Sequence, residues 1–424
     1  MMSFFKHTFF VVLMVVTGAS YCNAQDYDYE FINLDANHIT MNGADWSGLQ
    51  RAINTKRDSR RRVHKFNIVQ IGDSHIQPGI LSGEVRRKLQ SRFGNGGRGM
   101  IAPLALSGTN EPSNYVIHSS ASVSSRTRLL NRSWPVENGL TGVAVSFAGR
   151  STDLTIRDKN GDEFTFVTII HAPHGGYNRA VVNGEELLAD SVSPYASRFA
   201  LPESTSEVTL EGLPCTSAFW GAVLFNDLPG VVYTEIGNNG ATYSSYSKID
   251  NFAQELALLE PDLVILSMGT NEAAGNVDVL EPGMDRLIGA IRAANPNVTF
   301  LLTTPMEFQQ RRGGHFAVNS NGHRARDIVM DYGKKHKIAT WDMFTVSGGD
   351  GHSNLWIAEG LMNGRDHLHL LVKGYELQGK LLGDALLEVL SSSVTPSIHR
   401  SSSDVPYPPA RKVNTQQQIP NKKR

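Results

Sequence analysis

Residues 65–79, KFNIVQIGDSHIQPG, decide the fold that we predict for this chain. The run 66–71 is short, mostly apolar and rich in β-branched residues, which is typical of a strand buried in a parallel sheet. It ends at GDSH (72–75), and an apolar pattern of helical period follows over 80–93. Open α/β sheets place their reactive groups on such turns between a strand and a helix. We therefore expect Ser74 to lie at the centre of a functional site.

The alternation of strand and helix resumes after residue 228. Strand patterns over 230–236, 263–268, 298–303 and 338–342 alternate with helical patterns over 248–259, 281–294, 324–335 and 373–390. A short helix over 46–53 precedes the first strand. This order predicts a parallel, doubly wound sheet whose ligands bind beyond the carboxyl ends of the strands.

Between these two parts the hydrophobic period changes to that of strands. Seven short alternating or β-rich runs follow one another with turns such as Asn183-Gly184 between them: 142–147, 152–157, 163–171, 179–183, 196–201, 207–210 and 218–226. This spacing predicts an antiparallel β-sandwich inserted into the α/β chain over 108–227. His171 and His174 have no further ligand at metal spacing, so we interpret them as a loop pair.

One glycine-rich stretch needs a separate interpretation. Residues 94–99, GNGGRG, could form a phosphate cradle, but they follow a helix and lack the dinucleotide-binding spacing. We predict a flexible turn there.

The two ends of the chain have the composition of an export signal and of a disordered tail. Lys6, an apolar run over 9–16 and small residues up to Ala24 make 1–24 a predicted signal peptide, too short in its apolar part to span a membrane. Lipid anchoring at Cys22 is the less favoured alternative, because bulky Tyr21 precedes it. We expect a periplasmic or extracellular protein. Residues 392–424 are rich in Ser, Pro, Gln and Lys and are predicted to be disordered.

Charge and cysteine content exclude several classes of protein. The 40 basic and 41 acidic residues nearly cancel, so no global field favours nucleic acid or an anionic membrane as a partner. After removal of 1–24, Cys215 is the single cysteine, which excludes an intrachain disulfide. Cys215 lies in a polar loop without a nearby histidine, so we interpret it as structural rather than nucleophilic.

Polar residues at the predicted strand ends have complementary chemistry: Ser74, Gly240, Asn271, Asp366 and His369. A serine hydroxyl needs a base to take its proton, and histidine suits that task near neutral pH. One tight turn can bring Asp366 against the ring of His369. Backbone N–H groups of Ser74 and Gly240 and the amide of Asn271 are available as oxyanion donors. Taken singly, these features could be an ordinary turn, a helix cap and surface histidines, but their coincidence favours a serine hydrolase.

The four blocks GDSH (72–75), Gly240, GTNE (269–272) and DHLH (366–369) together resemble the signature of the SGNH (GDSL-like) hydrolases. The resemblance covers about 65–105 and 228–391 and implies a flavodoxin-like sheet. It also implies a Ser74, His369 and Asp366 triad, with an oxyanion hole from Ser74, Gly240 and Asn271. Gly237 stays open as an alternative to Gly240, although Gly240-Ala241 fits the second block better. The chain lacks the G-x-S-x-G elbow of the α/β-hydrolases.

Two positions depart from the family pattern. His75 stands where leucine is usual, and Glu272 stands where aspartate is usual; neither change removes a catalytic group. GDSH with GTNEA, the inserted sandwich and the export signal resemble the bacterial peptidoglycan O-acetylesterases, whose insert is similar to a carbohydrate-binding module. The resulting domains are a signal peptide (1–24), a hydrolase domain in two parts (25–107 and 228–391), the sandwich (108–227) and the tail (392–424).

We therefore predict a secreted serine esterase that removes O-acetyl groups from a carbohydrate polymer through an acetyl-enzyme on Ser74. O-acetylated peptidoglycan is the first-choice substrate, and no metal or organic cofactor is expected. The inserted sandwich is expected to help hold the polymer. The alternatives are an esterase of acetylated plant or host glycans, a sugar O-acetyltransferase and a non-catalytic wall-binding protein. A lipase or thioesterase is less favoured because no long apolar lid is evident.

Overall fold

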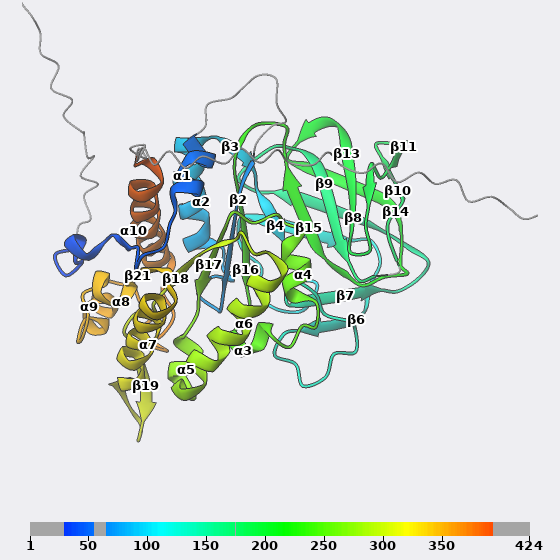
Figure 1. Ribbon diagram of the computed structural model, residues 1–424. Helices are drawn as coiled ribbons and strands as arrows, with labels where there is room; N and C mark the ends of the chain where they lie inside the picture. Colours follow the sequence, from blue (N-terminus) through cyan, green and yellow to red (C-terminus); the bar gives the residue numbers. More distant parts are fainter. Residues whose placement is uncertain (1–28, 55–64, 174, 393–424) are drawn as a thin grey trace, which may run out of the picture. The chain divides into compact units, whose positions relative to one another are not determined.

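The computed structural model describes residues 29–54, 65–173 and 175–392 (Figure 1). The predicted signal peptide over 1–24 lies outside the described residues, as do Cys22, His174 and the predicted tail from residue 393 onward. Within the described residues, no helix has both the length and the apolar character that crossing a membrane requires.

A seven-stranded sheet carries the hydrolase part, in the order β1-β21-β18-β17-β2-β16-β3. Its strands are β1 (Ile39–Thr40), β2 (Lys65–Gly72), β3 (Asn95–Gly97), β16 (Gly230–Gly237), β17 (Leu263–Ser267), β18 (Thr299–Thr303) and β21 (Ala339–Trp341). All neighbours are parallel except the edge strand β1. The first long strand, β2, lies between the second and the third, which is the flavodoxin-like order. The predicted fold class is therefore confirmed.

Helices cover both faces of this sheet (Figure 1). Helices α1 (Ser47–Asn54), α2 (Ile80–Phe93) and α10 (Val372–Ser391) pack on one face, and α4 (Phe252–Ala257), α6 (Leu280–Ala294) and α7 (Ser320–His336) on the other. Side chains of β2 alternate between the two cores: Ile68 packs with α2 and α10, whereas Val69 packs with α4 and α6. The predicted helix over 248–259 is shorter than expected: α4 covers Phe252–Ala257, and turns separate it from an earlier turn of helix, α3 (Tyr243–Tyr246), which Thr242 caps.

Several short elements complete the hydrolase part. The sequence patterns did not indicate the hairpin of β19 (Gln309–Arg312) and β20 (His315–Val318). The other short elements are η1 (Leu34–Ala36), α5 (Thr270–Ala274), η2 (Val277–Val279), α8 (Met343–Val346) and α9 (Ser353–Ala358).

Two antiparallel sheets form the inserted sandwich. One has the order β11-β10-β14-β8-β5, and the other β12-β13-β9-β15-β7-β6 with β4 paired to β15. All seven predicted runs are strands: β7 (Val143–Phe147), β8 (Ser151–Asp158), β9 (Phe164–His171), β10 (Arg179–Val182), β13 (Ala196–Thr205), β14 (Glu207–Pro214) and β15 (Phe219–Phe225). The prediction missed β5 (Tyr115–Ser119), β6 (Val123–Arg128), β11 (Glu185–Leu188) and β12 (Ser191–Val192). Apolar side chains from both sheets, such as Leu154 and Phe199, share one core.

The prediction of a flexible turn over 94–99 is wrong. Asn95–Gly97 forms β3 beside β16, and Gly99–Ile101 forms β4 beside β15 of the sandwich. The glycines permit close backbone approach, since a Cβ on Gly97 would lie 2.5 Å from the Cα of Phe225. This stretch passes directly from the hydrolase sheet to the sandwich. β4 is therefore a strand of the sandwich, although it precedes the proposed insert over 108–227.

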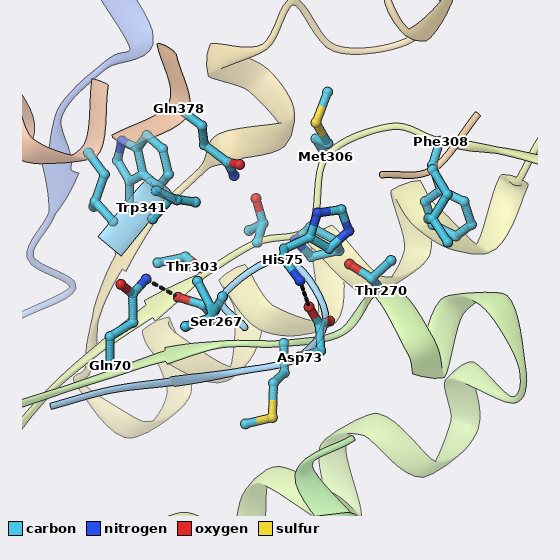
Figure 2. A pocket seen from close by; sticks show the side chains of 17 residues that line it. Gln70, Asp73, His75, Ser267, Thr270, Thr303, Met306, Phe308, Trp341 and Gln378 are labelled. Atoms are coloured by element: carbon cyan, nitrogen blue, oxygen red, sulfur yellow. Dashed lines mark hydrogen bonds between the residues drawn. The ribbon is translucent and has the colours of Figure 1, made fainter. Parts of the chain in front are cut away.

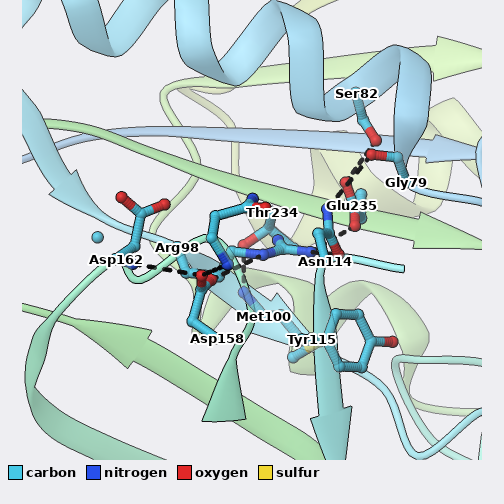
Figure 3. Close-up of polar contacts among 12 residues, drawn as sticks. Gly79, Ser82, Arg98, Met100, Asn114, Tyr115, Asp158, Asp162, Thr234 and Glu235 are labelled. Atoms are coloured by element: carbon cyan, nitrogen blue, oxygen red, sulfur yellow. Dashed lines mark hydrogen bonds and ion pairs between the residues drawn. The ribbon is translucent and has the colours of Figure 1, made fainter. Parts of the chain in front are cut away.

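A buried charge network also joins the two parts (Figure 3). The guanidinium of Arg98 donates to Glu235 of β16 (2.6 Å) and to Asn114 (3.2 Å), and its Nε lies 3.8 Å from Asp158 of the sandwich. Ser82 of α2 donates to the other oxygen of Glu235. Burial alone would raise the pKa of Glu235, but the charges of Arg98 and Arg86, together with the hydrogen bonds from Ser82 and Arg98, outweigh it, and the pKa lies below its ordinary value. The network ties α2, the sheet and the insert together.

Candidate active site

Ser74, His369 and Asp366 lie together at the carboxyl end of the parallel sheet. Ser74 follows β2, and the other two residues come from the loop that precedes α10. The Nε2 atom of His369 lies 2.9 Å from Oγ of Ser74, and its Nδ1 lies 3.1 Å from Oδ2 of Asp366. This is the arrangement in which an imidazole can take the hydroxyl proton while a carboxylate orients the ring.

The loop around Asp366 holds its carboxylate in one orientation. Its Oδ1 accepts hydrogen bonds from the backbone N–H groups of Leu368 and His369, both at 3.0 Å. Asn363 donates its side-chain amide to Oδ2 at 3.2 Å. Burial would raise the pKa of Asp366, but these N–H bonds and the His369 ring outweigh it and lower the pKa. Asp366 is therefore a carboxylate over the whole neutral range.

The three expected oxyanion donors come from three strand ends. Gly240 lies in the loop after β16 with φ +77°, and Asn271 lies in the first turn of α5. Among the hydrogen bonds of the described residues, none uses the backbone N–H of Ser74 or Gly240. The Nδ2 of Asn271 donates one hydrogen to the backbone oxygen of Ala241 (2.9 Å), which holds the amide in place, and the other to Oδ2 of Asp73 (3.3 Å). An oxyanion would take the second, longer hydrogen bond. We propose these three groups as the oxyanion hole.

Gly237, the alternative second-block glycine, has a different position. It is the last residue of β16, and a Cβ there would lie 2.2 Å from the backbone nitrogen of Gln77. Gly237 therefore allows the turn after GDSH to lie against β16. We keep Gly240 as the proposed donor.

The model of the GDSL-like lipase/acylhydrolase family matches residues 205–377. This segment contains Gly240, GTNE and DHLH, while GDSH precedes it on the far side of the insert. The chain carries a GDSL-like lipase/acylhydrolase domain. It is a carboxylic ester hydrolase of the SGNH type.

One solved structure supports the fold, and two others are similar over a smaller part of the chain. One described as a peptidoglycan O-acetylesterase has 20% identity and a TM-score of 0.67, over 86% of this chain and 99% of that chain. A lipase/acylhydrolase from Enterococcus faecalis has 18% identity and a TM-score of 0.30, over 38% of this chain and 77% of its own. Est24, a carbohydrate acetylesterase from Sinorhizobium meliloti, has 16% identity and a TM-score of 0.29, over 38% and 79%. No curated protein matches the sequence.

His75, the first departure from the family pattern, is half-buried beside the base. Its ring centroid lies 5.4 Å from that of His369, and its Nδ1 lies 3.2 Å from the hydroxyl of Tyr375. Burial, together with the His369 charge, lowers the pKa of His75 to about 3. His75 is therefore neutral, so an imidazolium on His369 does not face a second positive ring.

Asp73 lies under the proposed oxyanion hole. Its Oδ1 accepts the backbone N–H of His75 at 2.9 Å, and its Oδ2 accepts the amide of Asn271. Burial, with a smaller contribution from Glu272, raises the pKa of Asp73 to about 7. Below pH 7 the carboxyl group is mostly protonated and spares the oxyanion a nearby negative charge. The quoted motif contains Asp73, but its sequence alone gave no sign of this contact.

Glu272, the second departure, connects two of the motif blocks. Its Oε1 accepts the backbone N–H of Tyr243 at 2.9 Å, at the start of α3. Burial raises the pKa of Glu272, although its backbone hydrogen bonds act in the opposite direction. Its carboxyl group fixes the chain just after Gly240 and Ala241. The longer side chain thus has a positioning role.

A small cavity lies beneath the GDSH turn, between the sheet and α10 (Figure 2). Its volume is about 30 Å³, which is room enough for water. Asp73, His75 and Gln378 line it, as does Gln70, which donates to the hydroxyl of Ser267 at 2.9 Å. The turn that carries Ser74 therefore rests on a partly polar layer rather than on a purely apolar core.

The inserted sandwich reaches the site, which the sequence patterns did not indicate. A Cβ on Gly240 would lie 2.7 Å from Cδ1 of Leu130, in the loop after β6. The amide of Asn238 donates to the backbone oxygen of Thr141 at 3.0 Å. Gln77, just after the GDSH turn, donates to the side chain of Asn110 at 2.7 Å. The site is thus composite, with residues of both the hydrolase part and the insert.

The remaining candidate residues have no place in the site. His171 is buried in β9, where Nδ1 lies 2.8 Å from the backbone oxygen of Ala172 and Nε2 lies 3.1 Å from Oγ of Ser197. It is therefore a strand residue rather than a loop residue, so that interpretation is corrected. Cys215 is a free thiol, and burial raises its pKa. Among the described residues, no group of three or more His, Cys, Asp or Glu side chains could hold a metal ion.

Proposed function

We propose that this protein removes O-acetyl groups from a carbohydrate polymer, with O-acetylated peptidoglycan as the first-choice substrate. The observation that carries the proposal is the continuous contact from Asp366 through His369 to Ser74, at 3.1 and 2.9 Å. Polymer chemistry is supported by the likeness to a peptidoglycan O-acetylesterase along most of both chains, insert included. We also propose export by residues 1–24 to the periplasm or the extracellular space.

The geometry accounts for both halves of the reaction. His369 accepts the proton of Ser74 as Oγ bonds to the acetyl carbon, and the carbonyl electrons move to the oxygen. The proposed donors of Ser74, Gly240 and Asn271 stabilise that oxyanion. The carbonyl re-forms as the sugar oxygen leaves with the proton from His369. Water then repeats the sequence, giving its proton to His369 and releasing acetate and free Ser74.

The experiment compares acetate release from O-acetylated peptidoglycan and from acetylated xylan, using the wild type, Ser74→Ala and Ser124→Ala. Ser124 is an exposed serine of β6 that belongs neither to the proposed triad nor to the proposed oxyanion hole, so its variant is the control. Removing a triad nucleophile should cost on the order of 10⁴ to 10⁶ in rate. Release from xylan but not from peptidoglycan would indicate that the substrate is another acetylated glycan. Release that persists in Ser74→Ala would refute the mechanism.

A further inference from the structure

The end of β6 and the loop after it form an exposed edge next to the active site. We call residues 126–132, RTRLLNR, the insert rim. β6 lies at the edge of its sheet (Figure 1). Arg126 and Arg128 are exposed and alternate with buried Thr127, so both side chains point outward. Leu130 is 46% exposed, and Arg132 is exposed as well.

Contacts on two sides connect the insert rim to the proposed oxyanion hole. Leu130 lies against Gly240, as described above. Arg128 donates from Nη1 to the backbone oxygen of Gly108 at 3.2 Å, and a Cβ on Gly108 would lie 2.9 Å from Nη1 of Arg126. The next residues, Thr109 and Asn110, hydrogen-bond to Gln77 and to Asn239, which immediately precedes Gly240. Residues 108–110 thus link the rim arginines to Gln77 and Asn239, beside the proposed oxyanion hole.

The insert rim is held in place before any substrate arrives. The hydroxyl of Thr127 donates to the backbone oxygen of Val136 at 2.8 Å and accepts its N–H at 3.2 Å. The backbone N–H of Asn131 donates to the oxygen of Arg128 at 2.9 Å. Leu129 and Val136 are buried in the same core as Ala241. Little ordering is therefore needed when a ligand binds.

The positive charge of the insert rim is not balanced by nearby carboxylates. Among the described residues, Arg126, Arg128 and Arg132 form no ion pair, whereas Arg157, Arg179 and Arg198 of the same insert each have a carboxylate within 4 Å. The first acidic residue after the rim, Glu137, lies beside Glu255 of α4. Guanidinium groups bind carboxylates through paired hydrogen bonds, so three unbalanced arginines favour an anionic ligand.

We propose that the insert rim is the part of the substrate site that selects anionic glycans, with the arginines on substrate carboxylates and Leu130 against the sugar next to Gly240. This inference rests on the proposed function and narrows its substrate class. Peptidoglycan, whose peptide stems carry carboxylates, has this chemistry, whereas acetylated xylan without acidic substituents lacks it. Such exposed contacts weaken with ionic strength, so turnover of the anionic polymer depends on salt.

The test replaces the three rim arginines together by glutamine. Arg150→Gln is the matched control, because Arg150 is exposed in the same insert beyond the far end of β7. The triple variant should keep its kcat/KM for 4-nitrophenyl acetate and lose about tenfold on O-acetylated peptidoglycan, mainly through KM. The wild-type rate on peptidoglycan should fall between about 50 and about 500 mM sodium chloride, and the variant should lose this dependence. Replacement by lysine should retain it.

Two results would overturn the inference. One is an unchanged kcat/KM and salt dependence of the glutamine variant on peptidoglycan. The other is an equal loss on 4-nitrophenyl acetate, since the arginines would then act on the catalytic centre. If the wild type hydrolyses 4-nitrophenyl acetate but no acetylated glycan, the proposed function itself fails. In that case, cosedimentation of Ser74→Ala with peptidoglycan sacculi, measured with and without the rim arginines, tests whether the rim binds the polymer.

Discussion

Asn271 offers the sharpest test of the proposed oxyanion hole. Its amide is the one side-chain donor among the three proposed, and the bonds to Ala241 (2.9 Å) and Asp73 (3.3 Å) preorganise it. In Asn271→Ala the N–H groups of Ser74 and Gly240 remain. Loss of one such donor costs about 10² to 10³ in kcat, or roughly 3 to 4 kcal/mol of transition-state stabilisation.

The effect on folding should be much smaller. The side chain is half-buried and makes two hydrogen bonds, of which the one to Asp73 is long. At about 1 kcal/mol for each neutral bond, the free energy of unfolding should fall by roughly 1 to 2 kcal/mol. The triad keeps its contacts, so the variant should fold and still bind ester.

The assay is steady-state hydrolysis of 4-nitrophenyl acetate, together with urea unfolding. Both acylation and deacylation pass through an oxyanion, so kcat should fall without a burst of 4-nitrophenol. Asn295→Ala is the matched control: Asn295 caps α6 at the opposite edge of the sheet and also donates to a backbone oxygen, that of Pro261. If Asn271→Ala folds and loses less than fivefold in kcat, Asn271 is not a donor of the oxyanion hole.

Three further perturbations test other parts of the structure. Because the pKa of Asp73 is raised from 3.8 to about 7 on folding, the wild type loses stability as the pH rises through this range. The free energy of unfolding of Asp73→Asn should therefore increase by about 3 kcal/mol relative to that of the wild type between pH 5 and pH 8, as measured in urea titrations. Arg98→Met removes the ion-pair partner of the buried Glu235 carboxylate, which keeps the hydrogen bond from Ser82 and the charge of Arg86. The change should cost about 3 to 5 kcal/mol of unfolding free energy, part of it recovered by adding Glu235→Gln. Gly237→Ala puts a Cβ 2.2 Å from the backbone of Gln77 and should lower both kcat and the melting temperature, whereas an unchanged kcat would contradict the packing described for that turn.

The proposed triad could be predicted because its residues follow buried parallel strands, and the ends of such strands meet at one edge whatever lies between them in the sequence. Leu130 could not be predicted in the same way. Its contact with Gly240 depends on how the sandwich is seated on the sheet. The prediction of a flexible turn over 94–99 was wrong for the same reason: it depended on distant parts of the chain. The strands β3 and β4 pair with β16 and β15, both more than a hundred residues away.

The contacts between the insert and the hydrolase part also decide how the role of the insert can be tested. Removing residues 108–227 would take away Asp158 and Asn114, leaving the buried Arg98 with Glu235 alone among these partners, and would leave β4 without its neighbour β15. Uncompensated buried charge and an exposed strand edge both destabilise a fold. Lost activity after such a deletion would therefore report unfolding as readily as lost substrate binding. Substitutions at the insert rim leave these buried contacts intact, so a change in polymer turnover can be assigned to the substrate site.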